Sequence, residues 1–235
     1  MKFNKWTLGL AAVGVVSLTS ATQADEAKMS MVNTALSSTT LSGYVDTSIQ
    51  YNPTGGGSTA PVSFNSGKSN GFNLNVVDLA LDHPEDESPW AAGYHVELWA
   101  GPDASALATS PLNWRNASYG GTFGSDIGIP QAYVTLRTPV GNGIDWKLGV
   151  FDTVVGYEST SDLLNPNYTH SYGYTIEPVS HTGLLATYAF TSELSVSAGI
   201  ADSYGALVND RTPQTVGGAA DSFKTYMASI AYTAP

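Results

Sequence analysis

The sequence predicts an all-β protein, an antiparallel transmembrane β-barrel of about eight strands, and three observations lead to this fold class. Apolar and polar residues alternate with a period of two along eight segments, which is typical of half-buried strands. The connections between these segments are alternately short and long, as in barrels with turns on one side of a membrane and loops on the other. The chain also begins with a segment typical of exported proteins.

That first segment has two lysines, an apolar run from Trp6 to Leu18, and small residues that end at Ala24. This order of charge, apolar run and small residues indicates a signal peptide at residues 1–24, with cleavage after Ala24. The apolar run is too short to cross a bilayer core of about 30 Å as a helix. We therefore expect an exported protein whose final location is the outer membrane.

The rest of the chain divides into two parts by its pattern. Residues 25–40 lack a strong periodicity and predict a flexible lead-in, whereas residues 41–235 predict a single barrel domain. The expected strands are at 41–51, 71–83, 90–100, 130–138, 143–153, 183–191, 194–203 and 224–233. In the second of them the alternation changes phase between Val76 and Val77, which indicates a β-bulge.

The connections support a barrel more than a soluble sandwich. Short turns with the sequences HPEDESP, PVGN and SE join the second strand to the third, the fourth to the fifth and the sixth to the seventh. The other connections are long and rich in Gly, Ser, Asn and Pro. We therefore expect the short turns at one end of the sheet and the long loops at the other.

The two faces of the strands differ in chemistry. One is apolar, with tyrosines near strand ends, and suits contact with lipid. The other is polar and suits a wet lumen, although the same alternation also occurs in a soluble sandwich, whose apolar face forms the core. Under the barrel interpretation, the charged candidates for lining a pore are Asp46, Glu97, Arg137, Asp145, Lys147 and Asp152.

Composition and motifs exclude several classes of protein. The net charge is −11 and only 12% of residues are charged, so a nucleic-acid partner is not expected. There is no cysteine, and therefore no disulfide or lipid-anchoring cysteine. The histidines have no metal-site spacing, and no nucleophile elbow, P-loop or dinucleotide fingerprint is present. We expect no enzyme activity, no cofactor and no metal.

Several strings in the chain resemble one family. They are LSGYVDTSIQYN, GFNLNVVDLALDHP with GYHVELWAGP, and IPQAYVTLRTPVGNGIDWKLGVFDT. A dispersed set of single residues also matches: Gly156, Tyr157, Glu158, Asn165, Asn167, Ser171, Pro178, His181 and Gly183. From Leu41 to about Tyr232 the chain resembles the β-barrel porins of Gram-negative outer membranes, in the OmpL-like porin-2 group. The resemblance implies an outer-membrane barrel, passive diffusion of small hydrophilic solutes or ions, and no catalytic residues.

The chain departs from this family in its length. Such porins are considerably longer and usually end with a terminal aromatic residue, whereas this chain ends at Pro235. An eight-stranded barrel is nearly filled by its own side chains, so it is hardly an open pore. We therefore expect an N-terminal fragment of a larger porin; the alternative is a small closed outer-membrane barrel with a structural or adhesive role. Oligomeric state, including a homo-oligomer, is left open.

The longest interruption of the strand pattern is the segment 156–182, which is too long for a hairpin turn and rich in tyrosine. We expect it to fold inward and constrict the lumen, with Glu158 and Glu177 favouring cations. The other candidates in this loop are Asn165, Asn167, Tyr168, Tyr172 and His181. Two alternatives remain: an external loop without a role in transport, and the carbohydrate platform of a secreted β-sandwich.

Overall fold

The structure describes mainly the strand-rich part of the chain. The computed structural model divides into residues 1–40 and 41–235, and only the second unit is described in detail. The expected signal peptide, and the lead-in up to residue 37, lie outside the described residues. The structure describes residues 38–51, 68, 70–107, 127–202, 204, 213–216, 219–222 and 224–234.

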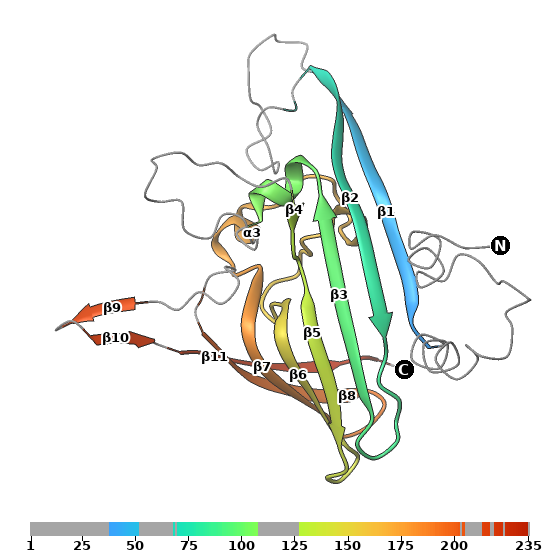
Figure 1. The fold of residues 1–235 in the computed structure, drawn as a ribbon, viewed down its shortest axis with the longest axis vertical. Helices are drawn as coiled ribbons and strands as arrows, with labels where there is room; N and C mark the ends of the chain where they lie inside the picture. The colour runs from blue at the N-terminus through green and yellow to red at the C-terminus, as the bar shows by residue number, and fades with distance from the viewer. Residues whose placement is uncertain are drawn as a thin grey trace, which may run out of the picture. The chain divides into compact units, whose positions relative to one another are not determined.

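Eight strands pair in chain order and form one curved sheet (Figure 1). A two-residue strand, β4 (Ile127–Gly128), adds to β3, and β9 (Pro213–Val216) with β10 (Ala219–Ser222) forms a separate hairpin. The eight are β1 (Thr40–Gln50), β2 (Gly71–His83), β3 (Ala92–Ala100), β5 (Ala132–Thr138), β6 (Ile144–Asp152), β7 (Ser180–Ala189), β8 (Leu194–Ala201) and β11 (Thr225–Tyr232).

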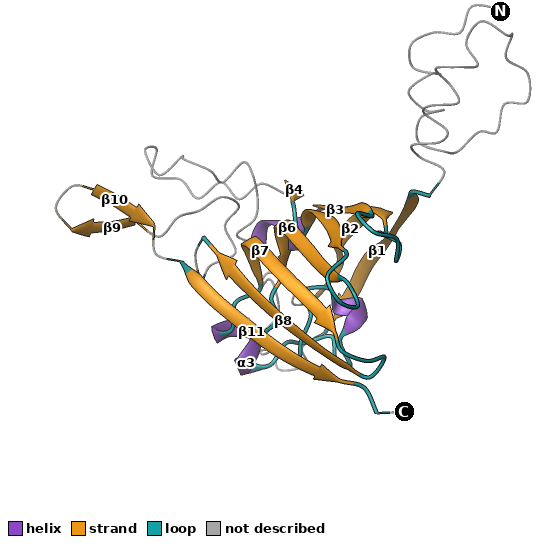
Figure 2. Ribbon diagram, turned by 90° about the horizontal axis from the view of Figure 1, so that it is seen from below, coloured by secondary structure: helices purple, strands orange, loops and turns teal. Residues whose placement is uncertain are grey.

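This architecture confirms the expected fold class, an all-β antiparallel sheet. The pairings from β2 to β11 whose registers are described are all antiparallel. Among the described strands, β1 and β11 stand at the two ends of the path and no pairing joins them, so the sheet is not closed. Figure 2 shows the curvature of the sheet from below. None of the described helices is long and apolar enough to cross a membrane.

The alternation in the sequence matches the two faces of the sheet. Apolar side chains such as Leu79, Val134 and Leu148 point outward and are more than half exposed. The described part of the chain supplies no second layer over them, unlike the core face of a sandwich. In β2, Asn75 and Val76 are both buried, so the expected change of phase occurs one residue earlier than the sequence indicates.

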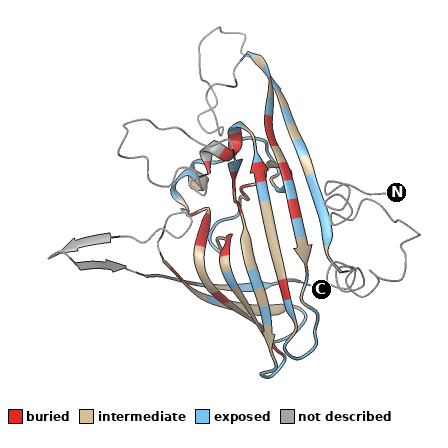
Figure 3. Cartoon of the chain, in the orientation of Figure 1, coloured by how far each residue is buried: buried red, intermediate tan, exposed pale blue. Residues whose placement is uncertain are grey.

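The buried positions gather in the half of the sheet nearest the long loops (Figure 3). One cluster joins Val76 and Trp99 to Ala104 and Leu107, which follow β3. A second cluster contains Phe151, Leu185, Ala201 and Met227. Both clusters lie on the inner face of the sheet, so that face is packed near the loops.

The short turns lie together at the opposite end of the sheet. In the turn between β5 and β6, Gly141 (φ 61°) and Gly143 (φ 102°) adopt backbone conformations that favour glycine. The Asn142 side-chain amide donates to the carbonyl oxygens of Ala189 and Phe190, each at 3.1 Å. These bonds tie one short turn to the next, which places both turns at one end, as expected from the loop lengths.

Candidate functional site

The inner face of the sheet is covered near the long loops by the segment 153–179, here called the inward loop. It contains a short 3₁₀ turn, η4 (Asp162–Leu164), and one helical turn, α3 (Tyr172–Ile176). Its Ser161 hydroxyl shares a hydrogen bond of 3.0 Å with the Tyr44 hydroxyl of β1. The Tyr168 hydroxyl accepts a hydrogen bond of 3.1 Å from Asn75 Nδ2 of β2. The loop therefore leaves β6, folds over the inner face and contacts the first two strands.

A buried histidine organises the inside of this loop. His170 Nδ1 lies 3.2 Å from Oε2 of Glu158, and its Nε2 lies 3.3 Å from Oδ1 of Asp162. The imidazole stacks on the Tyr174 ring at 3.9 Å between centroids. Burial raises the pKa of Tyr174 to about 12. His170 thus connects Glu158, Asp162 and Tyr174, which lie at three separate points of the loop.

Glu158 is held by the loop's own backbone. Its two carboxylate oxygens accept hydrogen bonds from the backbone N–H of Ser171 at 2.8 and 3.1 Å. These bonds, with those from the Ser171 hydroxyl and His170, lower the pKa of Glu158 below its usual value. Asn165 has a similar internal role, because its side chain accepts from the Ser159 N–H at 2.8 Å and donates to the Ser159 carbonyl at 2.7 Å.

A second segment covers the inner face next to this loop. The 3₁₀ helix η2 (Pro102–Ala106) follows β3, and Ala104 packs against Trp99. Asp103 is almost completely buried and forms an ion pair of 2.6 Å with Lys68. Burial raises the pKa of Asp103, and the Lys68 ammonium opposes this shift only in part.

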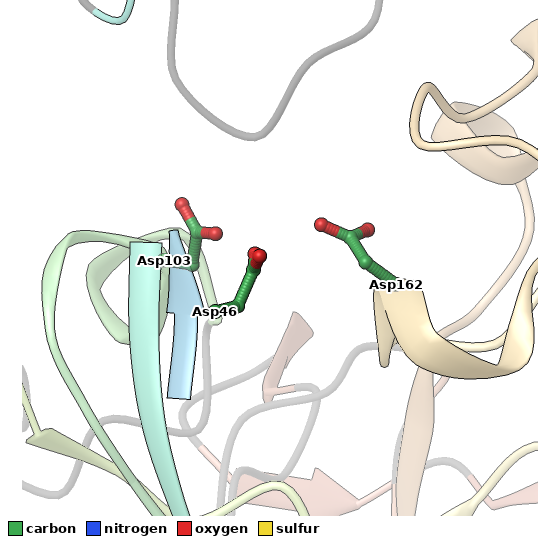
Figure 4. Close-up of side chains that lie close together, drawn as sticks. All are labelled: Asp46, Asp103 and Asp162. Carbon is green, nitrogen blue, oxygen red and sulfur yellow. The ribbon is translucent and has the colours of Figure 1, made fainter. Parts of the chain in front are cut away.

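Three carboxylates meet where η2 and the inward loop face β1, as Figure 4 shows. Asp46, Asp103 and Asp162 each offer an oxygen atom within 4.8 Å of the others. Asp46 also accepts a hydrogen bond of 2.8 Å from Asn75 Nδ2. Only Asp46 was expected from the sequence to line a pore. The other two lie in loops, where strand alternation carries no information about direction.

A cavity of about 280 Å³ lies between the inward loop and strands β1, β2, β3 and β6. Glu97 and Asp152, two of the expected pore-lining residues, form part of its wall. Glu97 is held by a hydrogen bond of 2.9 Å from Trp99 Nε1 and one of 3.4 Å from Gln131 Nε2. The backbone N–H of Asp152 donates to Gln131 Oε1 at 3.4 Å, so one glutamine positions both acidic residues.

The remaining expected pore-lining residues lie away from the cavity, on β5 and β6. Arg137 and Asp145 form a cross-strand ion pair of 2.5 Å, and Arg137 also donates to the Asn142 carbonyl at 2.6 Å. Lys147 places its ammonium 4.1 Å from the centroid of the Tyr133 ring. These charges are therefore neutralised or stacked on neighbouring strands of the same sheet.

The other candidates in the loop have varied positions. Asn167 and Tyr172 are exposed, and the backbone N–H of Glu177 donates to the Gly173 carbonyl at 3.0 Å and ends α3. Placing His181 in the loop was wrong, because β7 begins at Ser180. Phe151 of β6 pairs with His181 of β7, and the His181 ring is buried against the Phe151 side chain.

Sequence reasoning missed four side chains at this site: Asp78, His95, Asp103 and Asp162. Asp78 and His95 lie on the polar face of their strands, so the alternation could have indicated them. Asp103 and Asp162 had no such signal, since each lies in a short 3₁₀ turn within a long connection.

Comparison with known proteins identifies the class. Residues 38–234 match the family described as "Putative beta-barrel porin-2, OmpL-like". The chain therefore belongs to this porin family, and the resemblance found in the sequence is confirmed. Membership implies an outer-membrane location. No curated protein and no solved structure matches the chain.

Proposed function

We propose that this protein is an outer-membrane porin through which small hydrophilic solutes and ions diffuse passively. The observation that carries the proposal is the combination of an apolar outer face with a polar inner face that is partly covered by the inward loop. Tyr168 and Ser161 of that loop reach the first two strands, so the loop lies across the inner face instead of projecting from the sheet. Such a loop would narrow a lumen.

The charges near the inward loop favour cations over anions. Asp46, Asp78, Glu97 and Asp152 lie on the inner face, and Asp103 and Asp162 are added by the covering segments. Of the two loop residues expected to favour cations, Glu158 and Glu177, Glu158 is instead engaged by Ser171 and His170. We therefore assign the proposed preference to carboxylates of the strands, because Asp103 of η2 is paired with Lys68 and Asp162 of η4 lies against His170.

Export by a signal at residues 1–24, from a Gram-negative cell, belongs to the same proposal. The lipid bilayer would contact exposed apolar side chains of the outer face, such as Leu81, Leu98 and Ile230. The secreted β-sandwich is less favoured, because those side chains would form its core and here remain exposed. No bond-making step is part of the proposed role, and the porin family favours a protein that is not an enzyme.

The test is conductance of the full-length protein in planar bilayers, with a salt gradient to measure the reversal potential. We expect ion conductance with a weak preference for cations. Replacing residues 160–176 by a short Gly/Ser linker should raise single-channel conductance, because the linker is too short to reach β1 and β2. A protein that folds in the bilayer but does not conduct would contradict the porin proposal. Unchanged conductance and selectivity after loop replacement would contradict the constriction.

A further inference from the structure

The cavity between the strands and the inward loop has a wall of distinct chemistry. Acidic side chains come from three strands, namely Asp78, Glu97 and Asp152. Among the described residues that line it, none is a lysine or arginine; the one basic side chain is His95. An occupant with positive charge would therefore meet opposite charge on several sides.

Two polar atoms in this wall lack hydrogen-bond partners within the described part of the chain. Asp78 is 6% exposed, and its Oδ1 is buried without a hydrogen bond. His95 Nε2 is likewise buried without a hydrogen bond and lies 3.8 Å from Oε2 of Glu97. Unsatisfied buried polar atoms are costly and uncommon, so they indicate a missing partner. The Asp78 side chain also interacts with Glu97 and Trp99, so a ligand that donates a hydrogen bond would satisfy Oδ1 in particular.

His95 has a fixed place beside these carboxylates. Its Nδ1 lies 3.1 Å from Oδ1 of Asp82, and its ring stacks on Tyr133 at 5.2 Å between centroids. These contacts hold the imidazole against β5. Glu97 is equally fixed by Trp99, so the polar wall is organised without an occupant. Such preorganisation reduces the entropic cost of binding.

Part of the remaining wall is apolar. Ala80 of β2 and Trp99 of β3 line one side, and Leu163 and Leu164 of the inward loop line another. A hydrated inorganic ion gains little binding free energy from apolar surface. An amine with a short hydrocarbon chain gains binding free energy from both the acidic and the apolar parts of the wall. The volume of about 280 Å³ is at the lower end for ligand sites and suits a small molecule.

We propose that this cavity is a binding subsite for small organic cations, that is, alkyl amines or guanidinium compounds. The ammonium group lies against Asp78, Glu97 and Asp152, and the hydrocarbon chain lies against the leucines of the loop. The inference rests on the proposed porin function, because it names a class of solute that the inward loop and the strands retain together. It does not require that the cation be transported faster than others.

The test is calorimetric binding of putrescine to the folded full-length protein in detergent micelles, with the corresponding butanediol as the uncharged control. We expect putrescine to bind and the diol to bind at least about tenfold more weakly, because only the diamine carries charge. Asp78→Asn, which keeps the side-chain shape, should weaken putrescine binding by about tenfold or more. Glu193→Gln, on the short turn between β7 and β8, removes one acidic charge far from the cavity and should leave binding unchanged.

Folding of each variant is checked by circular dichroism and by its heat-dependent electrophoretic mobility. If Asp78→Asn does not fold, Asp152→Asn replaces it with the same expectation. Equal binding of putrescine and the diol, absence of binding, or equal weakening by Glu193→Gln would overturn the subsite. Conductance is recorded on the same preparation. Conductance without putrescine binding overturns the subsite alone, and putrescine binding without conductance overturns the porin function alone.

Discussion

The two ends of the inner face carry similar residue types in different surroundings. At the end of the short turns, Arg137 and Asp145 pair across neighbouring strands, and both side chains remain partly exposed to solvent. At the end of the long loops, Asp103 and His170 are almost completely buried and have acidic or basic partners. The strands therefore carry a solvated ion pair at one end, and the covering segments add buried charge networks at the other.

This difference shows what the covering segments add to the sheet. A solvated ion pair contributes little to stability, because water screens its charges. Burial removes that screening and makes each charge dependent on its partner. The end near the long loops should therefore be far more sensitive to single substitutions than the end near the short turns.

The largest expected effect is a loss of stability at the end near the long loops, caused by a substitution that forces two strands apart. Gly149 has φ 140°, and a Cβ there would lie 2.3 Å from the carbonyl oxygen of Ala132 on β5. We expect Gly149→Val to separate β5 from β6 and to lower the free energy of unfolding by about 3 kcal/mol or more. Urea titration followed by electrophoretic mobility measures it. Gly71→Ala is the control, since its Cβ meets no atom within 4 Å; equal losses in both variants would contradict the close approach.

An intermediate effect concerns pH and the inward loop. Hydrogen bonds lower the pKa of Glu158 from its ordinary value of 4.5, so its ionised form stabilises the folded loop. This contribution is present above about pH 4.5 and is lost as the pH falls through the lowered pKa. We expect an acid-tolerant protease to cleave the loop several-fold faster as the pH falls through this range.

The matched variant for this prediction is Glu158→Gln, which lacks the titrating group. Its loop should be cleaved at the faster rate already near neutral pH, and the rate should change less on acidification. If both proteins show the same pH profile, the bonds to Ser171 and His170 do not hold the loop.

The smallest expected effect concerns the solvated ion pair at the end near the short turns. We expect Asp145→Asn to change the free energy of unfolding by at most about 1 kcal/mol, because the pair with Arg137 is partly solvated. A double-mutant cycle with Arg137→Gln, read by urea titration, gives the coupling energy directly. A coupling of several kcal/mol would place this pair with the buried networks and remove the difference between the two ends.

Much of the fold could be predicted from the sequence, because the period of two is a local property of each strand. All eight expected strands are present with ends within three residues, and the inner-face positions of Glu97 and Asp145 follow from alternation alone. The start of β7 could not be predicted in the same way. Ser180 and His181 lack the alternating pattern and join the strand because β6 extends far enough to pair with them.

What the sequence by itself determined is the all-β class, the order of the strands, the two chemically distinct faces and the resemblance to a porin family. Only the tertiary structure decided which polar residues meet. Tyr168 and Asn75 are 93 positions apart and touch because the inward loop crosses the inner face. Asp162 lies beside Asp46 for the same reason, and Asp103 is brought there by η2, which follows β3. The physical cause is that alternation sets the direction of a side chain within a strand, whereas the path of a long loop depends on contacts between distant segments.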